Sequence, residues 1–188
     1  MKKILFNDKF GLTAAVLNGI KTQTRRICSK KLWSWSERFE LNKNKMTPDY
    51  FKVPYKIGEI VAIAQPYKCL YGEYKEPLRS ELIESAGFTN KMFVRPNLMP
   101  HQIEITDIKV EHIKDITDTC CLAEGIQQVN VRLEYDEPID TIRYSFYGTQ
   151  QLYDSPKLAY AALIDSICGK GTWEKNPNVF AFTFKLIK

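Results

Sequence analysis

The alternation of apolar and polar positions predicts strands in the middle and at the end of the chain. Residues 103–113 (I-E-I-T-D-I-K-V-E-H-I) alternate clearly, and so do residues 178–188 (N-V-F-A-F-T-F-K-L-I-K). A period of two is typical of half-buried strands. Shorter apolar segments predict further strands at 3–6, 22–27 and 58–65.

Capping residues predict helices between these strands. Asn7 or Asp8 can cap a helix that runs to about Asn18, and Gly19 suits the left-handed residue that follows a helix. Three further helices are predicted. One runs from Pro77 to Gly87, one starts at Thr117 or Asp118 and ends at Glu124, and one opens at Ser155-Pro156 and is closed by Gly169.

Two stretches, 28–56 and 127–154, are interpreted as irregular insertions. The sequence of 188 residues contains no repeat, low-complexity tract or interdomain linker. Strands interrupted by single helices are typical of an α+β fold. We therefore expect one α+β domain over residues 1–188, built as a small mixed β-barrel with flanking short helices.

Composition narrows the function classes. Apolar residues make up 44% of the chain and charged residues 26%, as in soluble globular proteins. The net charge of +5 suits an anionic partner but falls short of a dedicated nucleic-acid binder. The sequence has neither a signal peptide nor an apolar run that could span a membrane. We expect a cytoplasmic protein without a membrane partner.

The cysteines and histidines argue against a metal centre. The five cysteines are odd in number, irregularly spaced and without a C-x-x-C pair, which disfavours both disulfides and a zinc site. With only two histidines, a histidine-based metal cluster would lack ligands. We therefore expect no cofactor and no metal.

The segment G-I-K-T-Q-T-R-R, residues 19–26, carries the most distinctive motif. With the strand and helix before it, this segment resembles the G-x-K-T-x-T-x-R signature of the ASCH domain family, a relative of the RNA-binding PUA fold. Four later segments follow in the order found in longer phage and bacterial members: Y-K-I-G-E-I-V, I-T-D-I-K-V-E-H-I-K-D-I-T, T-D-T-C-C-L-A-E-G-I and W-E-K-N-P-N-V-F-A-F-T-F. The resemblance covers most of the chain and is weakest across 28–56 and 127–154.

The resemblance implies a PUA-like β-barrel with a cleft beside residues 19–26. Members of the family are proposed to bind RNA, so RNA or a nucleoside is the implied ligand. Some small members resemble amidohydrolases that remove an acyl group from the exocyclic amine of cytidine with a Lys, a Thr and a Glu. These roles fall on Lys21, Thr24 and Glu124. At least one relative is described as a ribonuclease.

Amide hydrolysis gives each of these side chains a chemical task. The Thr24 hydroxyl can attack the acyl carbon, and Lys21 can take its proton if burial and nearby arginines lower the pKa of the amine. Glu124 can orient Lys21 or protonate the leaving amine. Residues 21 and 24 of a regular strand point to opposite faces, so the scheme requires Lys21 to lie in the turn before the strand.

Structural roles are the alternatives at each position. Lys21 can instead pair with the negative end of the preceding helix dipole, and Thr24 can be an ordinary strand threonine. Glu124, in the last turn of a helix, opposes the helix dipole, which marks it for function unless it is a solvated surface residue.

Four further residues are candidates for nucleotide binding: Thr22, Arg25, Arg26 and Trp33. An arginine fork suits a phosphate, but neighbours on a strand point to opposite sides, so we expect only one arginine to face a cleft and the other to be solvated. Trp33 can stack on a base or pin the insertion to the barrel. A metal-dependent ribonuclease has less support, because the sequence offers no obvious cluster of carboxylates or histidines. The oligomeric state stays open.

Overall fold

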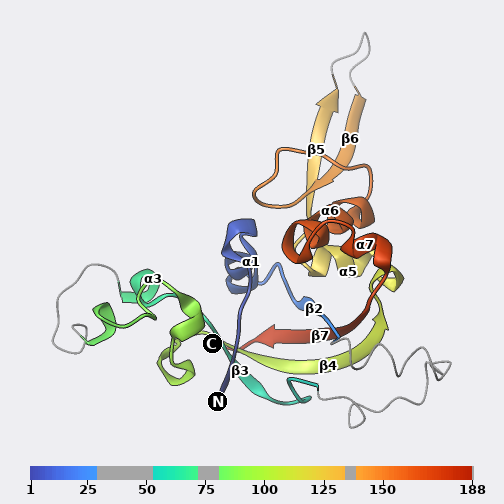
Figure 1. The fold of residues 1–188 in the computed structure, drawn as a ribbon. Coiled ribbons are helices and arrows are strands. Elements are labelled where there is room, and N and C mark those ends of the chain that lie inside the picture. Colours follow the sequence, from blue (N-terminus) through green and yellow to red (C-terminus); the bar gives the residue numbers. More distant parts are fainter. Residues whose placement is uncertain (29–52, 72–80, 134–138, 188) are drawn as a thin grey trace.

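The computed structural model describes residues 1–28, 53–71, 81–133 and 139–187, and its main feature is an open sheet of five strands in the order β1-β3-β4-β7-β2 (Figure 1). β1 pairs with β3 in parallel, and the other pairs are antiparallel. The strands are β1 (Lys2–Ile4), β2 (Gln23–Ile27), β3 (Ile60–Ile63), β4 (Gln102–His112) and β7 (Asn178–Leu186).

The long strands β4 and β7 are the two that the alternation predicts most clearly, and the structure confirms them. Their register shifts once, between Ile105 and Asp107. β7 is buried at both odd and even positions from Asn178 to Phe182, because it lies inside the sheet with side chains packed on both faces. The alternating pattern therefore marked a strand correctly but understated how deeply it is buried.

The α+β class is confirmed, whereas the expected closed barrel is not found within the described residues. β1 and β2 form the two edges of the sheet and do not pair with each other there. The guanidinium of Arg26 on β2 instead donates a hydrogen bond to the carbonyl of Leu5, just after β1. A side chain links the two edges where a barrel would have a hydrogen-bonded ladder.

The helix expected between residues 7 and 18 is divided in two. Asn7 caps the short 3-10 helix η1 (Asp8–Phe10), and α1 follows as Leu12–Leu17. Gly11 separates them with φ +61°, a left-handed conformation that glycine adopts without a steric penalty. The cap was therefore predicted correctly, and the break at Gly11 was not.

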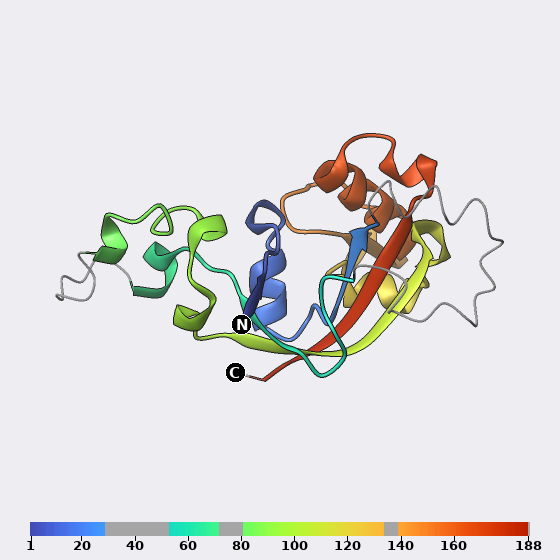
Figure 2. The same cartoon turned by 60° about the horizontal axis from the view of Figure 1, so that its bottom comes forward.

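Helices α5 (Asp118–Ala123), α6 (Pro156–Cys168) and α7 (Thr172–Lys175) lie together on one side of α1 (Figure 1). Thr117 caps α5 and Ser155 caps α6, as their sequences predict. On the other side of α1 lie α3 (Tyr67–Tyr71) and the turns η3 (Lys91–Phe93) and η4 (Pro96–Leu98), as Figure 2 also shows. Of the helix expected at 77–87, only the part from Glu81 lies within the described residues, and it is helical to Ile83.

The expected irregular insertion at 127–154 is largely a β-hairpin. β5 (Gln127–Leu133) pairs with β6 (Ile139–Ser145), and the hairpin projects from the rest of the molecule (Figure 1). Val129 and Val131 alternate with polar neighbours, a short strand signal that the interpretation overlooked. Most of the other expected insertion, 29–52, lies outside the described residues.

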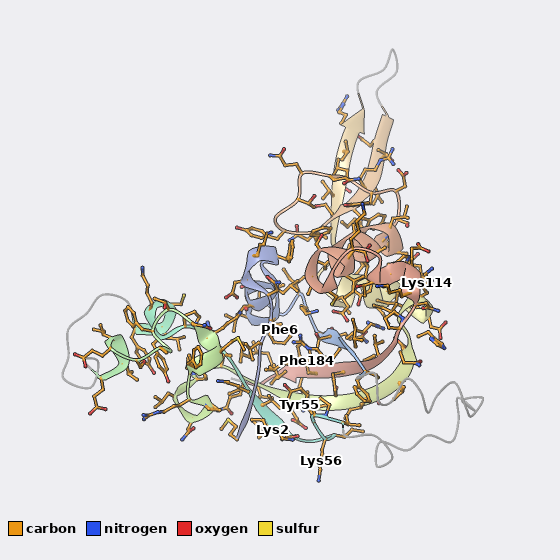
Figure 3. The ribbon with its side chains drawn as sticks, in the orientation of Figure 1. Lys2, Phe6, Tyr55, Lys56, Lys114 and Phe184 are labelled. Carbon is orange, nitrogen blue, oxygen red and sulfur yellow. The ribbon has the colours of Figure 1, made fainter. Side chains whose placement is uncertain are left out.

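The main core lies between the sheet and helices α1, α5 and α6. Figure 3 shows Phe6 and Phe184 at its centre, with their ring centroids 5.7 Å apart. A smaller cluster around Tyr67 packs beside α3. Among the described helices, none combines the length and apolar character that crossing a bilayer requires.

Candidate functional site

A cavity of about 130 Å³ lies among β2, the segment leading into α1, the end of α5 and helix α6. The apolar part of the lining is formed by Phe6, Leu12 and the apolar face of α6. The polar side of the lining consists of Asn7, Lys21, Thr24, Arg25, Arg26, Glu124 and Tyr160. The proposed catalytic side chains and both arginines therefore border one cavity.

Lys21 lies in the turn before β2 and not on the strand itself. Gly19 adopts φ +72°, and the chain then turns so that the backbone N–H of Lys21 donates to the carbonyl of Ala15 at 2.9 Å. The backbone N–H of Thr22 donates to the carbonyl of Ala123, which ties this turn to the end of α5. Because β2 begins only at Gln23, the objection that residues 21 and 24 must face opposite ways does not apply.

The amine of Lys21 is bound to Glu124 in two ways. Its Nζ lies 2.5 Å from Oε2 of Glu124 and donates to the carbonyl oxygen of the same residue at 2.8 Å. Lys21 is 1% exposed and Glu124 is 4% exposed, so water does not screen the pair. A solvated surface role for Glu124 is therefore excluded.

The same contact assigns Lys21 a structural task, but at a different helix from the one expected. Glu124 is the C-terminal cap of α5, and its carbonyl is one of the acceptors that the end of a helix leaves unpaired. Lys21 thus stabilises the end of α5, and not that of α1, in addition to pairing with the carboxylate.

Arg25 joins this pair to a second carboxylate. Its NH1 donates to Oε1 of Glu124 at 3.1 Å, while Nε and NH2 lie 2.8 and 2.7 Å from Oε1 of Glu111 on β4. Two cations and two anions therefore form one network, which is buried except at the half-buried Glu111. Nothing in the sequence indicated Glu111, because an acid in an alternating strand reads as a solvent-facing residue.

Burial and neighbouring charges shift the pKa of both Lys21 and Arg25. Burial lowers the pKa of Lys21, with Arg26 and Arg25 acting in the same direction, and the attraction of Glu124 does not fully offset this. Burial would also lower the pKa of Arg25, but Glu124 and its other neighbours outweigh it and raise that pKa above its ordinary value. The guanidinium stays charged, while the amine is closer to losing its proton.

Thr24 sits on β2 opposite Phe182 of β7 and is 5% exposed. It lines the same cavity as Lys21 and Glu124. Its place in the strand is compatible with the simple role of a strand threonine, and its place in the cavity lining is compatible with a role in the site.

The two arginines differ from the expectation that one would be solvated. Arg25 is buried, Arg26 is half-buried, and both line the cavity. β2 is an edge strand, so side chains from both of its faces can border the space beside its free edge.

Of the other binding candidates, Thr22 is not in the cavity lining. It is exposed, and its carbonyl accepts a hydrogen bond from the backbone N–H of Phe184. Trp33 lies outside the described residues.

Tyr160 is a cavity residue that the sequence did not single out. It is almost completely buried on α6, with its ring packed edge-on against Trp173 at a centroid distance of 6.2 Å. Its hydroxyl finds no hydrogen-bond partner among the described residues. Burial raises the pKa of Tyr160 well above its ordinary value, so the phenol stays neutral.

The described part of the chain contains no group of three or more histidine, cysteine, aspartate or glutamate side chains that could hold a metal ion. His101 contacts Gln65 and His112 contacts the carbonyl of Asn176, away from the cavity.

Comparison of the chain with family models, with curated protein sequences and with solved structures gives no match. The resemblance to the ASCH family therefore rests on the order of the motifs.

Proposed function

We propose that this cavity binds a modified nucleoside and hydrolyses the amide on its exocyclic amine, with acylated cytidine as the substrate class. The observation that carries the proposal is that a buried amine–carboxylate pair and the buried Thr24 border one cavity. An enclosed site supports a small ligand better than an open basic groove would.

The size of the cavity limits what can enter it. An engineered protein cavity of about 150 Å³ is known to hold benzene. The cavity beside β2 measures about 130 Å³, so it suits one six-membered ring or an acyl-amide group. The sugar of a nucleoside would then lie at the opening.

The side chains supply the steps of an acyl transfer. The Thr24 oxygen attacks the acyl carbon and gives its proton to the neutral amine of Lys21, which the lowered pKa favours. Glu124 holds that amine in place through Oε2. The Lys21 ammonium then protonates the departing nitrogen of cytidine, and water releases the acyl group from Thr24 as a carboxylic acid. Arg26 or a backbone N–H would stabilise the oxyanion.

The same proposal places the chain in the ASCH family, with a PUA-like arrangement of its strands. Support comes from the order of the sequence motifs and from the position of residues 19–26 beside the cavity.

The direct test is to incubate the purified chain with N4-acetylcytidine and to measure released cytidine. We expect release by the wild type and loss of release in Thr24→Val, which keeps the shape of the side chain and removes its hydroxyl. Thr22→Val is the matched control, because Thr22 belongs to the same segment but is exposed and outside the cavity lining. Absence of release by the intact wild type would reject the hydrolase.

RNA binding is a second candidate, favoured by the net charge of +5 and by the half-buried Arg26 in the cavity lining. A base could enter the cavity while its phosphates stay outside, near basic side chains. We expect RNA affinity that falls with salt, since phosphate contacts release counterions. An affinity that does not change with salt would argue against this candidate.

A further inference from the structure

The guanidinium of Arg25 is divided between two carboxylates from different parts of the fold. Nε and NH2 approach one oxygen of Glu111 at 2.8 and 2.7 Å, and only NH1 reaches Glu124, at 3.1 Å. Glu124 therefore offers Oε1 to Arg25 and Oε2 to Lys21. An arginine is otherwise well suited to bind both oxygens of one carboxylate with its parallel N–H groups.

We propose that Glu111 is a positioning residue. Because Glu111 binds Nε and NH2 of Arg25, only NH1 of Arg25 is left to bind Glu124. The second oxygen of Glu124, Oε2, then stays available to Lys21. Glu111 does not touch Lys21 itself. It acts through Arg25 and then through Glu124.

The loss of the Glu111 carboxylate has two consequences for the pKa of Lys21, and both act in the same direction. Arg25 becomes free to bind Glu124 with two nitrogens and to compete with Lys21 for Oε2. The network also loses one negative charge and keeps both cations, so the protonated form of Lys21 becomes less favourable. Both changes lower the pKa of Lys21.

Within the part of the chain that the structure describes, the charged and titratable groups around Lys21 come from β2, α5 and α6, and they include the thiol of Cys168 in the cavity lining. Glu124 at the end of α5 attracts the ammonium, while Arg25 and Arg26 on β2 repel it. The ring of Phe6 lies 6.0 Å from Nζ. Tyr160 on α6 lines the same cavity as a neutral phenol. Among these groups, Glu124 is the only anion in contact with the amine. The way its two oxygens are shared between Lys21 and Arg25 therefore controls the pKa of Lys21.

The test compares three substitutions in strand β4. Glu111→Gln keeps the length and an acceptor oxygen but removes the charge, and Glu111→Asp keeps the charge at shorter reach. Glu104→Gln is the matched control, because Glu104 lies on the same strand and pairs with Lys185 at the surface, 3.0 Å away.

The first readout needs no turnover. Lysine labelled at its terminal carbon is titrated by NMR in the full chain, and the Lys21 signal is identified by its loss in Lys21→Arg. We expect a lower pKa of Lys21 in Glu111→Gln, a smaller decrease in Glu111→Asp and no change in Glu104→Gln. An unchanged Lys21 titration in Glu111→Gln overturns the inference. If Glu111→Gln does not fold, Glu111→Asp is titrated instead. A Lys21 titration in Glu111→Asp identical to that of the wild type then overturns the inference.

The second readout rests on the proposed function. With acylated cytidine, Glu111→Gln is expected to lower kcat about ten- to hundredfold, by analogy with the loss of residues that orient the ligands of metal sites, with KM little changed. The acid limb of its pH profile should move to lower pH. If Glu111→Gln shifts the Lys21 titration but the wild type has no hydrolase activity, the inference about Glu111 holds and the hydrolase is rejected. If the wild type is active but Glu111→Gln leaves the Lys21 titration unchanged, the hydrolase holds and the inference about Glu111 is rejected.

Discussion

Lys21–Glu124 and Lys185–Glu104 are ion pairs of the same kind in very different surroundings. The side chains of the first pair are 1% and 6% exposed, while those of the second are 60% and 33% exposed. Water screens the surface pair and competes for its hydrogen bonds, so such a pair contributes little to stability. The buried pair cannot exchange its partner for water, and each charge there depends on the other.

The largest expected effect separates these two pairs. Glu124→Ala leaves Lys21 and Arg25 as buried cations without their shared anion, and breaking a buried pair costs about 3–5 kcal/mol. Glu104→Ala removes a surface partner and is expected to cost at most about 1 kcal/mol. Urea unfolding of both variants measures the difference. Equal losses of stability would show that the site is more hydrated than its burial indicates.

A second effect depends on pH. The pKa of Lys21 in the folded chain lies below its ordinary 10.5, because burial disfavours the charged amine. Between the folded and the unfolded pKa, the unfolded chain binds more protons, so this group makes folding more favourable as the pH rises through that window.

Lys21→Met removes this titration. The wild type should therefore gain stability relative to the variant as the pH approaches 10.5, by at most about 1.4 kcal/mol per pH unit. Lys185→Met at the surface serves as control and should show no comparable trend. Unfolding free energies at several pH values provide the measurement, and parallel curves for wild type and Lys21→Met would contradict the expectation.

The smallest effect concerns two buried tyrosines whose hydroxyls differ in hydrogen bonding. The hydroxyl of Tyr67 accepts from the backbone N–H of Arg95 at 2.8 Å, whereas that of Tyr160 has no partner within the described residues. Tyr67→Phe should destabilise the chain by about 1 kcal/mol, because the partly buried N–H of Arg95 loses its acceptor. Tyr160→Phe should be neutral or stabilising by a similar amount. Thermal unfolding of both variants tests the contrast, and a clear loss of stability in Tyr160→Phe would reveal a partner for its hydroxyl.

Local signals predicted the elements that local chemistry controls. Thr117 and Ser155 identified the starts of α5 and α6, because a capping side chain acts on backbone groups only a few residues away. The alternation in β4 and β7 was long enough to predict both strands. The β5–β6 hairpin was missed because its signal is short and lies within a polar stretch.

Apart from the pairing of Lys21 with Glu124, which the family resemblance implied, features that join distant segments were predicted poorly. Closure of a barrel depends on how the two edge strands meet, and here Arg26 contacts Leu5 where a strand pairing was expected. Glu111 and Arg25 are 86 residues apart, so no local pattern connects them. Tyr160 looks like any core residue of an amphipathic helix until the packing leaves its hydroxyl without a partner.

The amino-acid sequence alone determined where most of the helices and strands form and which residue types stand in the segment 19–26. Tertiary structure decided that Lys21 and Glu124, 103 residues apart, share a dry contact, and that Arg25 divides its guanidinium between Glu111 and Glu124. The physical reason is the distance along the chain over which each effect acts. Caps and periodicity act over a few residues, whereas burial and charge pairing exist only after packing has removed water from groups that the chain keeps far apart.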